Sequence, residues 1–239
     1  MFAKKKFTCF TPAGAARFLV GVAALLALAA PALAQSTFSA TYCTYTQGGW
    51  GAPPNGNNPG TILKNNFSFV YPSGFVEVGI PGTGGFSMTF TTAKAIEVYL
   101  PAGKTANALN ADLLNPTSSP SGVFGGQVLA LQLGLDFNFA GIIGNPGFLN
   151  LVFFDTNTSF DGLTVLDVLA AANWALGGGS LADVAGVDHS DFSIRGNISG
   201  THNLNDLVSF LNQGFDNCIP SDWVKQHLME SGSPPPPPG

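Results

Sequence analysis

The sequence predicts a mixed α+β domain that follows an export signal. The first 34 residues resemble a secretory signal peptide. Short segments rich in Phe, Val and Thr alternate with Gly/Pro turns in the first half of the chain, and longer helix-like segments occupy the second half. We therefore expect an antiparallel β-meander followed by helices, with one disulfide joining the two ends of the domain.

Residues 1–34 contain the three parts of a signal peptide. Lys4, Lys5, Lys6 and Arg17 form a basic start, residues 18–30 are apolar, and Ala32-Leu33-Ala34 is a small-residue cleavage site. An uncleaved anchor is the alternative, but the apolar run is shorter than the ~20 residues that a spanning helix needs. We expect a secreted or cell-surface protein with no transmembrane segment after cleavage. Its expected parts are the signal peptide (1–34), a single secreted α+β domain (35–220) and a C-terminal region with a polyproline spacer (221–239).

The charge balance narrows the class of partner. Four of the nine Lys and Arg residues lie in the signal, and all fourteen acidic residues follow it, so the expected mature chain carries a net charge of −9. Nucleic acids and anionic membranes attract basic surfaces, so neither is expected as a partner. Charged residues make up only 10% of the sequence. A surface built from uncharged polar residues tolerates self-association.

Two cysteines remain after the signal. Cys9 is lost with it, while Cys43 and Cys218 stand near the start and near the end of the domain. Two cysteines in an oxidising compartment predict a disulfide. A metal site is less favoured, because no other Cys or His lies nearby at the spacing that metal ligands usually have. Two free buried thiols are the alternative.

The first half of the domain has the pattern of short strands. A Gly/Pro/Asn-rich loop covers residues 48–60. Residues 95–100 fit either a fourth strand or the start of a helix. The expected strands are residues 66–71, 75–80 and 86–92, separated by turns at 72–74 and 81–85.

The second half has a more helical character. Residues 164–176 form the best helical pattern in the chain, ended by three glycines, and residues 204–211 form a shorter one. Residues 149–154 fit a buried strand or a short apolar turn. Residues 127–138 are ambiguous, because Leu alternates as in a strand although Gln, Leu and Ala favour helix.

The segment Cys43-Thr44-Tyr45-Thr46-Gln47-Gly48-Gly49-Trp50 resembles the opening of a group of uncharacterised secreted bacterial surface proteins. Their domains begin with a Cys-Thr-x-Thr-Gln-Gly-x-Trp motif. The stretches 122–131, 160–169 and 211–218 are similar as well, so the resemblance covers most of the domain in order. It implies a surface location and a helix over residues 127–135, but no activity. Relatives often continue with Tyr-Trp-Lys-Asn-His, which Gly, Pro and Asn replace here, so no role of that segment is carried over.

Catalytic and metal-binding patterns are weak. His189, His202 and His227 belong to no recognisable nucleophile, metal or phosphate motif. No catalytic residue, cofactor or metal centre is therefore expected. One segment, made of Asp155, Asn157, Ser159 and Asp161, carries oxygen side chains at alternate positions, as a weak calcium loop would.

The calcium interpretation fails in detail. Phe160 stands where the loop needs Gly, and Leu166 stands where it needs a bidentate Glu. Turn formation and helix capping explain the same side chains better.

Aromatic residues near the domain start suggest a second binding class. Tyr45 and Trp50 could contact a glycan by stacking on sugar rings, although packing in the core is the better explanation. The expected function is a non-enzymatic structural or adhesive protein of the cell surface or extracellular matrix. Its expected partner is itself, as a homo-oligomer or polymer, or a surface glycan. A carbohydrate-binding module that uses the N-terminal aromatics is the alternative, and an extracellular hydrolase with an unrecognised site is a weaker third option.

Deleting residues 231–239 should leave the melting temperature within about one or two degrees. This segment consists of Ser, Gly and five prolines, and it has no apolar side chain to bury beyond the proline rings. Differential scanning calorimetry of the full and truncated proteins tests this expectation. A larger drop would mean that the tail packs on the domain.

Overall fold

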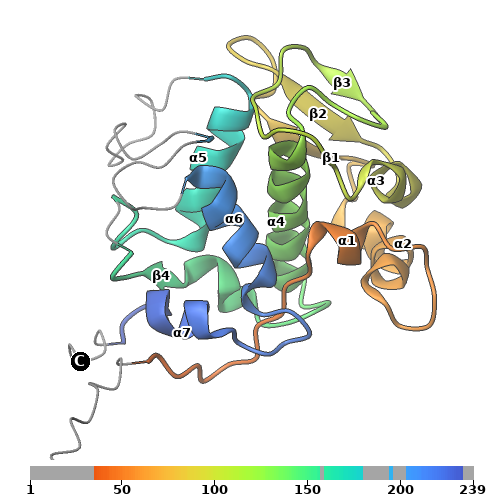
Figure 1. Ribbon diagram of the computed structural model, residues 1–239. Helices are drawn as coiled ribbons and strands as arrows, with labels where there is room; N and C mark the ends of the chain where they lie inside the picture. Colours follow the sequence, from red (N-terminus) through yellow and green to blue (C-terminus); the bar gives the residue numbers. More distant parts are fainter. Residues whose placement is uncertain (1–34, 157–158, 180–193, 196–202, 234–239) are drawn as a thin grey trace, which may run out of the picture. The chain divides into compact units, whose positions relative to one another are not determined.

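The computed structural model describes residues 35–156, 159–179, 194–195 and 203–233 (Figure 1). These residues form a mixed α+β unit, which confirms the predicted fold class. The signal peptide and Pro234–Pro238 lie outside the described residues. Within the described ranges, no helix is both long enough and apolar enough to cross a membrane.

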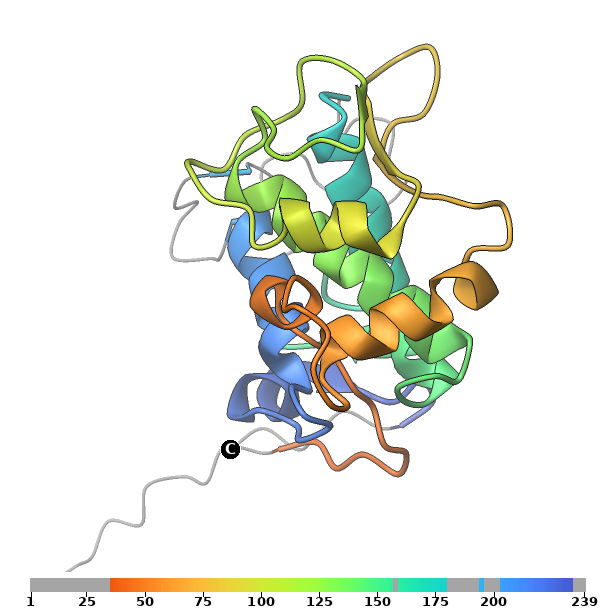
Figure 2. The ribbon, with the colours of Figure 1, turned by 90° about the vertical axis from the view of Figure 1, so that its right-hand side faces the viewer.

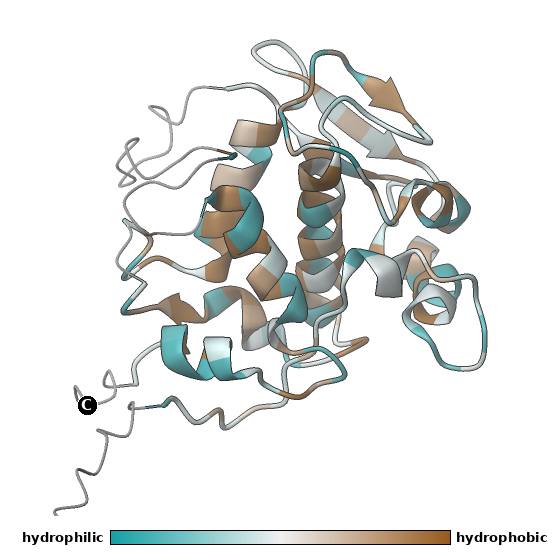
Figure 3. Cartoon of the chain, in the orientation of Figure 1, coloured by the Kyte–Doolittle hydropathy of each residue, from teal (hydrophilic) through white to brown (hydrophobic). Residues whose placement is uncertain are grey.

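Helix α4 (Val123–Phe139) is the centre of the unit. Helices α5 (Val165–Leu176) and α6 (Leu204–Gly214) pack on one side of it, and α1 (Gln47–Trp50) packs on another (Figure 1). The 3₁₀ helix η1 (Pro146–Asn150) also packs against it. Twelve residues of α4 are buried, and hydrophobic residues follow its length (Figure 3).

The burial of α4 explains its ambiguous sequence. Leu129, Leu131, Leu133 and Leu135 are all buried, although alternate positions of a helix point in different directions. A helix covered on several sides needs apolar residues around most of its circumference and so loses its amphipathic period. The helical interpretation of residues 127–138 is correct.

The larger sheet has three short strands. Strand β1 (Val76–Gly79) pairs antiparallel with β2 (Ser87–Phe90), with Val76 opposite Phe90. Strand β3 (Leu113–Leu114) joins β2 in parallel. The two central strands of the expected meander are therefore confirmed as a hairpin. The alternative of a helix over residues 95–100 is also correct, because α3 (Ala93–Tyr99) begins there with Thr92 as its N-cap.

The first expected strand is wrong. Residues 66–71 belong mainly to α2 (Pro59–Val70), which starts inside the predicted loop. Asn58 caps this helix by accepting from the Thr61 N–H at 2.9 Å, and Pro59 occupies the first turn. Phe67 and Phe69 gave the alternation of a strand. On the helix, Leu63 and Phe67 share the buried face instead, while Phe69 is exposed.

The second half follows the sequence more closely. The capping box between Thr164 and Asp167 starts α5 where the pattern predicted a helix. Helix α6 also begins as expected, at Leu204. Residues 149–154 divide between η1 and a short strand, β4 (Val152–Phe153).

The predicted domain end at residue 220 is too early. Helix α7 (Asp222–His227) leads into β5 (Leu228–Met229), which pairs antiparallel with β4. Val224 and Leu228 are buried, but hydrophilic neighbours surround them in the sequence, so the segment looked like an exposed extension (Figure 3). Residues 221–230 complete the folded unit.

The predicted disulfide is confirmed. Cys43 and Cys218 are bonded, their Cα atoms lie 4.2 Å apart, and the bond spans 175 residues of sequence. The N-terminal segment therefore runs beside α7 (Figure 1). The backbone N–H of Ser36 donates to the carbonyl of Lys225 at 2.6 Å.

Replacing Cys43 by Ser should reduce the free energy of unfolding substantially, by up to about 5 kcal/mol on the loop-entropy estimate for a loop of this length. Urea unfolding of the oxidised wild type, Cys43→Ser and the double variant Cys43→Ser/Cys218→Ser measures the loss. The two variants should lose the same amount, since either change opens the loop.

Peptide mapping of the non-reduced protein is the matching chemical test. Two alkylatable thiols in the oxidised protein, or a bridge between two molecules, would contradict the intramolecular bond.

Candidate functional site

The opening motif, Cys43 to Trp50, connects the start of the domain to its end. Thr44 forms an isolated parallel bridge to Asp216. Its N–H donates to the carbonyl of Phe215 at 3.0 Å, and its hydroxyl accepts from the Phe215 N–H at 3.0 Å. Thr46 caps α1 by accepting from the Gly49 N–H. The two threonines thus bond the start of the domain to its end and begin the first helix.

Gln47 connects this motif to the central helix. Its Oε1 accepts from the Ala102 N–H at 3.0 Å, and its Nε2 donates to the Val123 carbonyl at 3.4 Å. A Cβ atom on Gly126 would lie 1.9 Å from Gln47 Oε1, so α4 needs glycine at this position. The buried amide therefore fixes the first turn of α4 against the motif.

Trp50 does not form a sugar-stacking surface. Its side chain is fully buried and packs against Phe137, with ring centroids 5.0 Å apart. Tyr45 is partly exposed, but its ring contacts the Trp50 ring edge-on at 5.3 Å. The predicted stacking role is wrong for Trp50, because the same large apolar surface that suits a sugar fills the core instead.

A second set of contacts holds the ends of the unit together. Glu230 accepts from the Ser39 N–H and hydroxyl at 2.9 and 2.7 Å, from the Ala40 N–H at 3.2 Å and from the Tyr42 hydroxyl at 3.0 Å. We call these contacts, together with the Cys43–Cys218 bond, the terminal clasp.

The contacts of the terminal clasp shift the pKa values of Tyr42 and Glu230. Burial raises the pKa of the Tyr42 phenol to about 12, helped by the hydrogen bond to Glu230 and its charge. Burial alone would raise the pKa of Glu230, but the hydrogen bonds from Ser39, Tyr42 and Ala40 outweigh it and lower the pKa. These shifts have a structural origin in the clasp.

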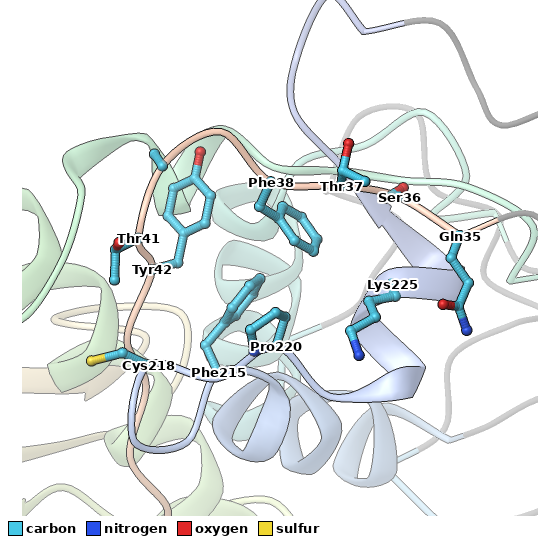
Figure 4. Close-up of a pocket in the computed structure, with 11 residues that line it drawn as sticks. Gln35, Ser36, Thr37, Phe38, Thr41, Tyr42, Phe215, Cys218, Pro220 and Lys225 are labelled. Atoms are coloured by element: carbon cyan, nitrogen blue, oxygen red, sulfur yellow. The ribbon is translucent and has the colours of Figure 1, made fainter.

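One pocket lies within the clasp. It has a volume of about 430 Å³, and Phe38, Phe215 and Pro220 face one another across it (Figure 4). The rings of Phe38 and Phe215 make an edge contact with centroids 5.1 Å apart. Lys225 is the charged side chain in its lining. The pocket is thus mainly a gap between packed aromatic residues of the two chain ends.

A second pocket lies among α1, α2 and α3, the three helices that face the viewer in Figure 2. Its volume is about 470 Å³. Lys64 on α2 and Lys94 on α3 bring cationic groups to it, and Glu97 brings a carboxylate that pairs with Lys94. The remaining lining consists of Trp50, Pro54, Gly60, Leu63 and Ala93.

The acidic loop before α5 is closed by its own hydrogen bonds. Asp161 Oδ1 accepts from the N–H and hydroxyl of Thr156 at 2.9 and 2.5 Å. Asp155 is an exposed residue of the same turn, Ser159 is partly buried, and Asn157 lies outside the described residues. Among the described residues, no three His, Cys, Asp or Glu side chains gather as a metal site would require. The contacts match those of a turn.

A partly buried hydrogen-bond chain crosses four elements. Asp136 accepts from the Tyr71 hydroxyl at 2.8 Å and from Gln132. Asn173 donates to Gln132 Oε1 and accepts from the Gly79 N–H. Burial raises the pKa of Asp136 although both hydrogen bonds lower it, and burial raises the pKa of Tyr71 as well. The chain fixes α2, α4, α5 and β1 relative to one another.

Sequence reasoning missed the pocket among α1, α2 and α3. His189 and His202 lie outside the described residues, and His227 packs on Trp223 with ring centroids 5.0 Å apart. The available signal was the position of two scarce lysines, Lys64 and Lys94, on either side of the expected strands. Only the tertiary structure brings them to one pocket. Comparison with protein-family models, curated proteins and solved structures finds no match to this chain.

Replacing Glu230 by Gln should lower the hydrogen-exchange protection of the Ser39 and Ala40 amides by roughly threefold to tenfold at pH 6, because the acceptor loses its charge. The pH dependence has a definite sign. Since the folded-state pKa of Glu230 is lowered, its contribution is complete above the usual pKa of 4.5 and is lost as the pH falls through the lower, folded-state value.

Exchange measured by NMR from pH 6 to pH 3 tests both statements. Protection of the two wild-type amides should fall toward that of the variant on acidification. The control Glu97→Gln should leave them unchanged, and equal protection in wild type and Glu230→Gln would contradict the clasp.

Proposed function

We propose that the protein is a non-enzymatic structural or adhesive component of the cell surface or extracellular matrix, which associates with itself or with a surface glycan. The terminal clasp carries this proposal. A disulfide is compatible with an oxidising, extracellular location. The resemblance of the opening motif to secreted surface proteins supports the same location.

The clasp has a mechanical consequence. Residues 36–42 and 219–230 lie together on one side of the disulfide, and the 175-residue span lies on the other. A tension applied to the two ends of the unit would load these short segments and the covalent bond. Helices α1 to α6 and the three-stranded sheet would remain outside the load path, whereas α7 and β5 belong to the loaded C-terminal segment. Such an arrangement suits a domain that is held at its ends and presents the rest of its surface.

The tyrosines with raised pKa values lie in contacts that hold the fold together. Tyr42 is bonded to Glu230, Tyr71 to Asp136 and Tyr99 to Ser119. Each pair joins segments that are distant in sequence. Shifted pKa values can mark catalytic groups, but structural networks produce them as well.

Exposed apolar residues support self-association. Phe69 and Phe139 are about 70% exposed, in a chain with few charged residues. Strand edges contribute little, because the described strands are two to four residues long. The edge N–H of Gly79 already donates to Asn173. Apolar side chains therefore supply the stronger basis for contacts between copies.

The proposal predicts concentration-dependent self-association of the oxidised protein. Phe69→Ser and Phe139→Ser should each weaken it, because each removes a large exposed apolar side chain. Gln213→Ser changes an exposed polar residue and serves as the control. Sedimentation velocity over a hundredfold concentration range provides the measurement.

A monodisperse monomer throughout that range, together with no loss of cell or matrix attachment on deletion of the gene, would overturn the proposal. The glycan-binding alternative is favoured by one specific observation, the pocket lined by Lys64 and Trp50.

A further inference from the structure

The pocket among α1, α2 and α3 gathers scarce positive charge. Lys64 and Lys94 line it, and they are two of the five Lys and Arg residues that follow residue 34. The same part of the chain carries fourteen acidic residues. Glu97 in the same lining offsets one of these charges, and the remaining positive charge in an acidic protein attracts an anionic ligand to that position. Lys94 pairs with Glu97, whereas Lys64 forms no ion pair among the described residues.

A buried donor without an acceptor lies at the same place. Trp50 lines the pocket, is fully buried, and its indole N–H has no hydrogen-bond partner among the described residues. Buried tryptophan N–H groups usually have an acceptor. The buried indole therefore forms part of the wall behind the pocket, where a bound ligand would change its surroundings.

The remaining lining selects the ligand class. The Glu97 side chain is 17% exposed and can accept hydrogen bonds from hydroxyl groups. Its charge disfavours a multiply charged phosphate more than a single carboxylate. Leu63, Pro54 and Ala93 add apolar walls. A volume of about 470 Å³ lies within the usual range for small-ligand sites.

We propose that this pocket binds a carboxylated saccharide, that is, a uronic-acid unit of a surface or matrix glycan. The carboxylate pairs with Lys64, and a hydroxyl donates to Glu97. The inference rests on the proposed extracellular function only for the source of the glycan. Trp50 remains in the core behind the pocket and serves as a reporter of its occupation.

The tryptophan side chains provide the test. The protein has three tryptophans, so its ¹H–¹⁵N spectrum should show three indole signals, which Trp174→Phe and Trp223→Phe variants assign by difference. Saturable titration of the oxidised protein with trigalacturonate should shift the Trp50 indole signal and leave the other two in place. No shift at saturation, or an equal shift with uncharged galactotriose or inorganic phosphate, would overturn the proposal.

A matched pair of lysine variants tests the charge. Lys64→Gln should weaken trigalacturonate binding by roughly threefold to tenfold and reduce its dependence on salt. Lys104→Gln makes the same charge change at an exposed position outside the pocket, and it should leave affinity unchanged. Equal losses in both variants would reveal a general charge effect and overturn the site.

Self-association measured on the same Lys64→Gln sample separates the two proposals. Lost binding with intact self-association supports the pocket as a distinct site. Absent trigalacturonate binding in a self-associating wild type overturns the site alone. Trigalacturonate binding by a strictly monomeric protein overturns self-association and leaves glycan attachment as the basis of the proposed function.

Discussion

The burial of α4 is the constraint on which the rest of the structure depends. A 17-residue helix with twelve buried residues cannot face water on a broad side, so other elements must cover it. Helices α1, α5 and α6, the 3₁₀ helix η1 and strand β1 all contact it. These elements come from both ends and the middle of the chain, so the fold requires the chain ends to meet near α4.

The terminal clasp follows from this requirement. The start of the domain must reach α4 through Gln47 and Trp50, and its end must reach α4 through α6. Cys43 and Cys218 flank these two contacts and lock them together. Glu230 then extends the connection to Ser39 and Tyr42. A motif that could have indicated binding thus mainly connects the two ends of the domain to α4.

Because the protein has few charged residues, the contacts of each charged side chain are informative about its role. Burial raises the pKa of Asp136, and the hydrogen bonds from Tyr71 and Gln132 offset part of the cost of burying its carboxyl group. Glu230 remains ionised and organises four donors at the chain ends. Lys64 forms no ion pair within the described part of the chain, so its position at a pocket is informative.

The sequence by itself determined the elements whose signals are local. Three such signals act within a few positions and can be identified from the sequence alone. They are the cap at Thr164, the glycines after α5 and the hairpin turn at residues 81–85. The pairing of Cys43 with Cys218 could also be predicted, because these are the two cysteines that follow the signal peptide. Tertiary structure decided the rest. Residues 66–71 became helix because Leu63 and Phe67 pack on one face, and Trp50 became core because Phe137 covers its ring. Such outcomes depend on contacts between residues that are distant in the sequence. A local pattern of apolar and polar side chains does not specify which distant segment will pack against it.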